Sequence, residues 1–97
     1  MFAYMIESFG CKHTEKVWKG ARTKKWSDEI ANNALRKMIM LNAAGDIQDL
    51  RIPPSNRLHK LKGNMKEYWA ISINNQWRII FKWLNANVQD LQIIDYH

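Results

Sequence analysis

The chain has 97 residues, expected to form one domain over residues 1–97, and its 46% hydrophobic and 25% charged residues exclude a disordered protein. Fifteen Lys and Arg residues against nine Asp and Glu residues leave a net charge of +6, which suits a polyanionic partner. The single cysteine excludes an internal disulfide, and neither a membrane-spanning run nor a signal peptide is recognisable, so we expect a cytoplasmic protein with no membrane partner. The sequence leaves open whether Met1 or Met5 is the natural start.

The first half of the chain has the pattern of helices. Residues 6–9 suit a short opening strand, and residues 11–19 predict a short amphipathic helix followed by a basic loop. Ser27 is the expected N-cap of a second helix, because acidic residues follow it and favour the positive end of the helix dipole. Apolar residues at three- and four-residue spacing from Ile30 predict about four turns, ending near Gly45.

The second half changes to the period of strands. Residues 46–56 contain two consecutive prolines and are expected to be a loop. Alternation then predicts three strands joined by tight turns, at residues 68–73, 77–83 and 88–95. The predicted fold is therefore α+β, with two N-terminal helices packed on one antiparallel, mostly meandering sheet. Alternation assigns three of the five tryptophans to the core and leaves Trp18 and Trp26 as candidates to face a partner.

Arg78 lies in mid-strand, on the face opposite Trp77 and Ile79. Burying its charge without a partner would be costly. Two explanations are open at this point. Arg78 forms a structural ion pair with Asp90 or Asp95, or it lies at the floor of a cleft that binds a phosphate.

A basic segment precedes the strands. From Leu50 to Lys66 there are five basic residues and no acidic one. If Leu58 and Leu61 are buried, the side chains between and beside them face solvent or a groove, namely His59, Lys60 and Lys62. The simpler interpretation is a solvated basic face that carries a histidine without a function.

The chain ends in Asp95-Tyr96-His97. The Asp95 carboxylate and the terminal carboxylate would both favour protonated His97, and a histidine that titrates near neutral pH suits proton transfer. The simpler interpretation is that Tyr96 covers the core and His97 has no role.

Together these segments suit a nuclease that uses no metal. The 2′-OH of RNA can attack the adjacent phosphorus, so the protein needs only to move two protons and to neutralise the phosphoryl charge. Histidines suit the proton steps, and Lys or Arg suits the phosphate. The nine acidic residues show no spacing typical of metal ligands, and no cofactor is expected.

Four blocks of the sequence, read in order, resemble the HigB branch of the RelE/ParE toxin superfamily. The blocks are Arg57-Leu58-His59-Lys60-Leu61-Lys62-Gly63, Tyr68-Trp69-Ala70-Ile71, Gln76-Trp77-Arg78-Ile79-Ile80-Phe81 and Asp95-Tyr96-His97. The resemblance is strongest over residues 56–97. It implies a RelE-like fold and a type II toxin that inhibits translation by cutting mRNA in the ribosomal A site. It also implies a HigA-type helix-turn-helix antitoxin as partner, through which alone the pair would bind operator DNA.

The resemblance also implies roles for individual residues. The catalytic residues would be His59, Asp95, Tyr96 and His97. Lys62 and Arg78 match basic positions expected to hold the scissile phosphate. Lys60 stands where relatives often have a neutral residue, so it is assigned only to RNA binding. The full set of predicted phosphate-binding and RNA-binding residues is Arg57, Lys60, Lys62, Lys66 and Arg78.

Three alternatives remain. A ParE-like toxin of the same fold would inhibit DNA gyrase, although a binding protein needs no such set of proton-transfer residues. A second possibility is a protein that occupies the ribosome without cutting, and a third is an RNA-binding module unrelated to toxins. A neighbouring gene for a helix-turn-helix protein would favour the toxin.

Overall fold

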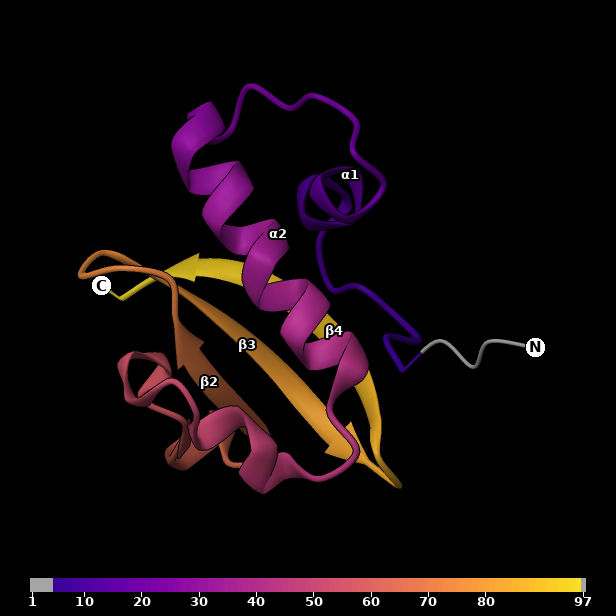
Figure 1. The fold of residues 1–97 in the computed structure, drawn as a ribbon, viewed down its shortest axis with the longest axis vertical. Helices are drawn as coiled ribbons and strands as arrows, with labels where there is room; N and C mark the ends of the chain where they lie inside the picture. The colour runs from indigo at the N-terminus through magenta and orange to yellow at the C-terminus, as the bar shows by residue number, and fades with distance from the viewer. Residues whose placement is uncertain (1–4, 97) are drawn as a thin grey trace.

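The computed structural model describes residues 5–96. Two helices, α1 (Lys12–Trp18) and α2 (Asp28–Ala43), precede four strands: β1 (His59–Lys60), β2 (Tyr68–Ser72), β3 (Trp77–Leu84) and β4 (Asn87–Asp95). The strands form one antiparallel sheet in the order β1-β2-β3-β4, and α2 crosses it diagonally (Figure 1). The predicted fold class is therefore confirmed.

Helix α2 begins as the sequence predicts. The Ser27 hydroxyl accepts a hydrogen bond from the Ile30 backbone N–H at 3.2 Å, and Asp28 and Glu29 occupy the first turn. The apolar stripe of the helix packs on the sheet, with Ala34, Met38 and Leu41 fully buried. This packing fixes which face of the sheet the helices cover.

The covered face of the sheet carries the core. Ile79 and Phe81 on β3 are completely buried beneath the helices, and Trp77 packs edge-on against Trp26, with ring centroids 6.2 Å apart. The expectation that Trp26 faces a partner is wrong, because its side chain is only 6% exposed between His13 and Trp77. Trp26 lies in a loop, where no periodic pattern could reveal its burial.

The segment between α2 and the sheet is more ordered than a plain loop. It forms short 3₁₀ helices η1 (Ile47–Arg51), η2 (Pro54–Asn56) and η3 (Gly63–Met65). Asn56 is fully buried, and its side-chain amide donates to the Leu50 carbonyl at 3.0 Å, which ties η2 to η1.

Both margins of the sheet are irregular. Strand β1 pairs only with Trp69 and Ala70, so no strand formed by the described residues borders the Ser72 end of β2. The predicted opening strand is reduced to two isolated parallel bridges to β4, Ile6 with Val88 and Phe9 with Leu91.

Candidate functional site

The sheet face turned away from α1 and α2, called the free face below, is defined by strand register. Residues directly opposite one another on antiparallel strands share a face. One row across the free face consists of Ser72, Arg78 and Ile94. The next row consists of His59, Ala70, Ile80 and Gln92.

A cluster on the free face joins β2, β3 and the residue that follows β4. The Tyr96 backbone N–H donates to the Gln76 carbonyl at 2.9 Å, which continues the pairing of β3 with β4. The Tyr96 ring lies over the Arg78 guanidinium, 4.9 Å from its Cζ, and the Tyr96 and Ser72 hydroxyls share a hydrogen bond. The Tyr96 side chain therefore reaches across β3 to β2 and covers Ser72, which is 5% exposed.

Arg78 has an unused hydrogen-bond donor. Its Nε is buried and has no acceptor among the described residues, although buried donors are nearly always paired. An anion bound beside Tyr96 would supply the acceptor, and a phosphate suits the planar guanidinium.

His59 lies on the edge strand, one row from Ser72 and Arg78. Its side chain is exposed, and its Nδ1 lies 2.7 Å from the Arg57 carbonyl oxygen. Because a carbonyl oxygen can only accept, Nδ1 carries a proton in this contact. The other ring nitrogen, Nε2, is then the acceptor of the neutral imidazole, as a general base requires.

The far end of the free face is neutralised by acidic residues. Lys82 lies 3.4 Å from the Asp90 carboxylate and 3.8 Å from that of Glu67, and the hydrogen bond with Asp90 raises the pKa of Lys82. The Tyr68 hydroxyl also donates to Asp90, at 3.4 Å. Asp90 thus forms its ion pair with Lys82 instead of Arg78, which removes one of the two structural partners expected for that arginine.

Several predicted site residues lie elsewhere. Asp95 is opposite Trp77, on the covered face, and accepts from the Gln76 side chain at 3.2 Å. Consecutive residues of an extended strand point to opposite faces, so Asp95 and Tyr96 diverge. The Lys60 ammonium lies 5.2 Å from the centre of the Trp69 ring. Three further predicted cations are exposed along the segment from η2 to η3, namely Arg57, Lys62 and Lys66, and the predicted His97 lies outside the described residues.

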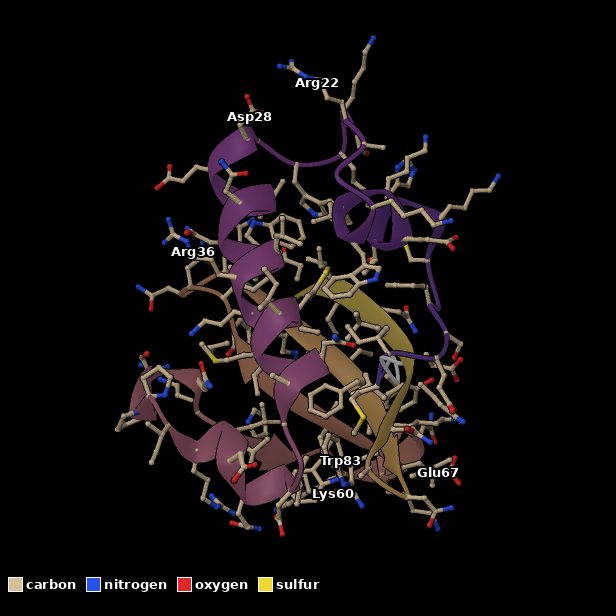
Figure 2. All side chains as sticks on the ribbon, turned by 45° about the vertical axis from the view of Figure 1, so that its right-hand side comes forward. Arg22, Asp28, Arg36, Lys60, Glu67 and Trp83 are labelled. Atoms are coloured by element: carbon tan, nitrogen blue, oxygen red, sulfur yellow. The ribbon has the colours of Figure 1, made fainter. Side chains whose placement is uncertain are left out.

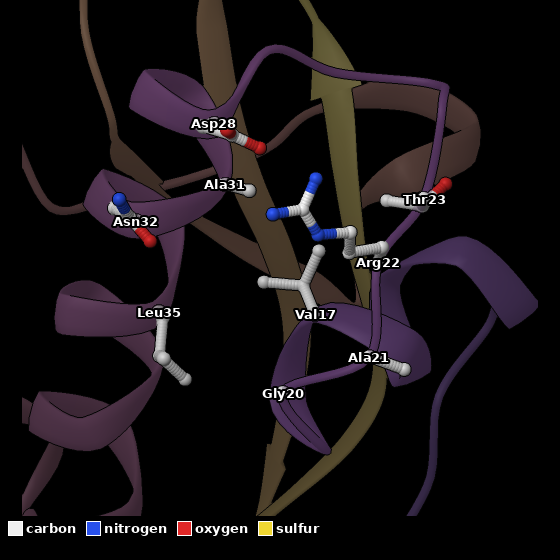
Figure 3. Close-up of a pocket in the computed structure, with 9 residues that line it drawn as sticks. All are labelled: Val17, Gly20, Ala21, Arg22, Thr23, Asp28, Ala31, Asn32 and Leu35. Atoms are coloured by element: carbon white, nitrogen blue, oxygen red, sulfur yellow. The ribbon is translucent and has the colours of Figure 1, made fainter.

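Two surface hollows flank the sheet. The helical hollow, about 310 Å³, lies between the α1–α2 loop and α2, with the Arg22 guanidinium extending into it near Asp28 (Figure 3). Figure 2 places Arg22 and Asp28 at the end of the molecule opposite Lys60. The β2 hollow, about 190 Å³, borders the free-face cluster and is lined by Lys37, Ser55, Arg57, Ser72, Ile73, Asn74 and Asn75.

Sequence reasoning missed Ser72 and Lys37. Alternation already places Ser72 on the face of Arg78, so its hydroxyl was detectable. Lys37 gave no signal, because its contact with Asn56 joins two segments that only the tertiary fold brings together. Within residues 5–96 no cluster of three His, Cys, Asp or Glu side chains could hold a metal ion. In the same range, no helix is long and apolar enough to cross a membrane.

Comparison with known proteins defines the class. The solution structure of the conserved hypothetical protein HP0894 from Helicobacter pylori superimposes on 95% of this chain and 96% of its own, with a TM-score of 0.54. At 15% sequence identity this likeness concerns the fold alone. A family model described as "RelE-like toxin of type II toxin-antitoxin system HigB" matches residues 7–97. Fold and match together define a RelE-like toxin.

Two relatives identify the branch. Toxin HigB-1 of Vibrio cholerae serotype O1 is 46% identical over 83 residues, which cover 84% of this chain and 87% of the relative. Endoribonuclease HigB of Proteus vulgaris is 28% identical over 93 residues, covering 96% and 100%. The chain belongs to the HigB-like toxin family of type II toxin–antitoxin systems. Membership implies a cognate antitoxin.

Proposed function

We propose that this toxin is an endoribonuclease that cuts mRNA on the ribosome without a metal ion and so inhibits translation. The observation that carries the proposal is the free-face cluster, in which Tyr96 covers the Arg78 guanidinium and bonds Ser72, with His59 one row away. The relative from Proteus vulgaris is named an endoribonuclease, which supports the same activity. A gyrase inhibitor would have no use for this combination of an imidazole, a phenol and a guanidinium whose Nε has no acceptor among the described residues.

The reaction requires only the RNA and side chains. The 2′-oxygen forms a bond to the adjacent phosphorus, and the bond from phosphorus to the 5′-oxygen breaks, leaving a 2′,3′-cyclic phosphate and a 5′-hydroxyl. A base takes the proton of the 2′-OH, and an acid protonates the departing 5′-oxygen. Each proton transfer is typically worth about 10²–10⁴-fold in rate.

Each residue has an assigned task. Arg78 binds a non-bridging oxygen of the scissile phosphate through its Nε donor and neutralises the charge that develops there. His59 and the predicted His97 share the two proton transfers. Tyr96 keeps Arg78 in place and lies where a base or the 2′-oxygen would approach. Asp95, opposite Trp77 in the strand register, keeps its predicted place in the catalytic set, where it would orient the end of the chain.

The remaining predicted cations would hold the RNA and the ribosome. Arg57, Lys60, Lys62 and Lys66 are exposed beside the cluster, and the net charge of +6 favours rRNA as well as mRNA. The hollow beside the cluster is only about 190 Å³ and would hold little of a long strand, so the ribosomal A site would present the mRNA. The cognate antitoxin would be a HigA-type helix-turn-helix protein that carries the pair to operator DNA.

The test is primer extension on a reporter mRNA after brief induction in cells, comparing the wild type with His97→Ala and Tyr96→Phe. We expect discrete in-frame cuts that disappear when the reporter start codon is removed and that weaken in both variants. End-group analysis should find 2′,3′-cyclic phosphates, whereas metal-dependent hydrolysis commonly leaves 5′-phosphates. Growth arrest with intact mRNA would overturn the proposal and favour either gyrase inhibition or ribosome occupation without cleavage. A DNA supercoiling assay would then distinguish these two alternatives.

A further inference from the structure

The β2 hollow is continuous with the candidate active site. Ser72 belongs to both, because its hydroxyl bonds Tyr96 and the same residue lines the hollow. Arg57 connects them a second time, since its carbonyl oxygen accepts from His59 Nδ1 and the same residue lines the hollow. The hollow exists because β1 is too short to border this end of β2, so η2 and α2 enclose the space instead.

The lining of the β2 hollow is that of an anion site. It includes two cations, Lys37 and Arg57, together with hydroxyl and amide groups, and no carboxylate. The other residues lining it are Ser55, Ser72, Ile73, Asn74 and Asn75. An anion that entered would meet positive charge on two sides and neutral hydrogen-bonding groups on the others.

Lys37 is held in the wall at an energetic cost. Lys37 is half-buried on α2, and its ammonium donates to the side-chain oxygen of buried Asn56. Partial burial lowers the pKa of Lys37. No acidic group within residues 5–96 forms an ion pair with it. A glutamine could donate to Asn56 from this position without desolvating a charge, so the cation is better explained by a ligand than by the contact with Asn56 alone.

Arg57 is also in an unusual state. Its backbone has φ of 49° and lies in the left-handed region, which disfavours residues with a side chain. Glycine would adopt this conformation without strain, yet a long cationic residue is present. Strained backbone of this kind concentrates at binding and catalytic sites.

We propose that the β2 hollow binds the RNA nucleotide next to the scissile phosphate, with the phosphate of that nucleotide between Lys37 and Arg57. This inference rests on the proposed nuclease function and extends it to Lys37, a residue on the helical layer. A volume of about 190 Å³ is below the roughly 300–1,000 Å³ of sites for drug-sized ligands, so it suits a single nucleotide unit. Asn74 and Asn75 also line the hollow, and the Asn75 side chain would contact the base or ribose, because the Asn74 side-chain oxygen already accepts from the Gln76 and Trp77 backbone N–H groups.

The experiment uses an RNA trinucleotide with 2′-O-methyl riboses, which lacks the attacking hydroxyl and cannot be cut. It is titrated into the ¹⁵N-labelled full-length protein, and amide shifts give both the location and the affinity. We expect the largest shifts at residues 55–57, 72–75 and around Lys37, with further shifts at Arg78 and Tyr96, where the scissile phosphate would lie. Lys37→Gln keeps an amide donor for Asn56 and removes the charge, and Arg57→Gln removes the other charge without touching that buried contact.

Each of these two variants should weaken binding roughly tenfold, equivalent to about 1.4 kcal/mol. Each should also reduce the salt dependence of binding by about 0.7 in the log–log slope, because one phosphate contact is lost. Lys37→Arg should restore both. Lys16→Gln is the matched control, because it removes one exposed cation from α1 and should change neither quantity. The ¹⁵N spectrum of each free variant confirms that it is folded.

Three results would overturn the subsite: no binding of the trinucleotide, equal weakening by Lys16→Gln, or shifts centred on the helical hollow. The test is separable from the nuclease proposal, because it requires neither the ribosome nor cleavage. If the trinucleotide binds in the β2 hollow but mRNA stays intact in cells, the nuclease proposal is wrong and the hollow remains an RNA-binding site. If mRNA is cut in cells and neither Lys37→Gln nor Arg57→Gln changes the cleavage, the nuclease proposal stands and the subsite is wrong.

Discussion

The apolar residues on the two faces of the sheet are covered by different groups. On the covered face, Ile79 and Phe81 are sealed by α1 and α2. On the free face, Ala70 and Ile80 are equally buried, although the helices lie on the other side. Two cation–aromatic pairs flank Ile80 along β3, Arg78 with Tyr96 on one side and Lys82 with Tyr68 on the other.

The two pairs differ in their acidic neighbours, and this difference supports placing the proposed active site at Arg78. Asp90 and Glu67 lie beside Lys82 and neutralise it, whereas the Nε of Arg78 remains without an acceptor among residues 5–96. The same contrast separates the hollows. The larger one contains both Arg22 and Asp28, and the smaller one has cations without a carboxylate. Unneutralised charge, more than cavity size, indicates where a polyanion binds.

The largest effect should come from the covered face. Phe81→Ala removes a fully buried aromatic ring and should lower the free energy of unfolding by about 3–5 kcal/mol. Its neighbour Lys82 points to the free face, so Lys82→Gln should leave the urea midpoint almost unchanged. Urea unfolding followed by tryptophan fluorescence measures both. Equal losses of stability in the two variants would contradict the division of the sheet into a covered face that carries the core and a free face.

The next effect concerns activity. Arg78→Gln should reduce cleavage of ribosome-bound mRNA about 10²–10³-fold, as expected for loss of a group that stabilises transition-state charge. The folded state should lose little, since the buried Nε donor that disappears has no acceptor among the described residues. Single-turnover cleavage on purified ribosomes measures the rate, and urea unfolding provides the control. A variant that cuts at the wild-type rate would remove Arg78 from the site.

How much of this the sequence predicted depends on the range of the interactions. The cap at Ser27, the stripe of α2 and the alternation of β3 are local patterns, and each is confirmed. Alternation also separates Asp95 from Tyr96, a consequence that the motif Asp95-Tyr96-His97 conceals when it is treated as one unit. The burial of Trp26 and the placement of Lys37 beside Asn56 depend on contacts between distant segments, for which a single sequence carries no periodic signal.

A smaller effect should distinguish Tyr96 from Ser72. Tyr96→Phe keeps the ring over Arg78 and removes the hydroxyl, while Ser72→Ala removes only the partner of that hydroxyl. If the hydroxyl takes part in proton transfer, Tyr96→Phe should slow cleavage by about 10²-fold, the lower end for such a step. Ser72→Ala should slow it less, because it only frees the hydroxyl to move, and Ser72→Thr should restore the rate. Single-turnover cleavage rates over a range of pH measure this. Identical losses in Ser72→Ala and Tyr96→Phe would show that the Tyr96 hydroxyl takes no part in proton transfer and that the ring only covers Arg78.

The smallest expected effect is the pH dependence of stability contributed by Lys37. Burial lowers the pKa of Lys37 below 10.5, so between the folded and unfolded pKa values the unfolded chain binds more protons than the folded one. Stability should therefore rise with pH through that window, because the cost of the desolvated cation disappears as the ammonium loses its proton. In Lys37→Gln this increase in stability should be absent. Urea midpoints of the wild type and the variant, measured between pH 8 and 10.5, should therefore show the wild type gaining stability relative to the variant as the pH rises.

Binding of the uncleavable trinucleotide to the wild type should change in the opposite direction. It should weaken over the same pH window, because the β2 hollow loses one of its two charges. If Lys37 serves RNA binding at a cost to stability, stability should rise with pH while trinucleotide binding weakens. If Lys37 serves only to hold Asn56, stability should rise with pH and binding should not change.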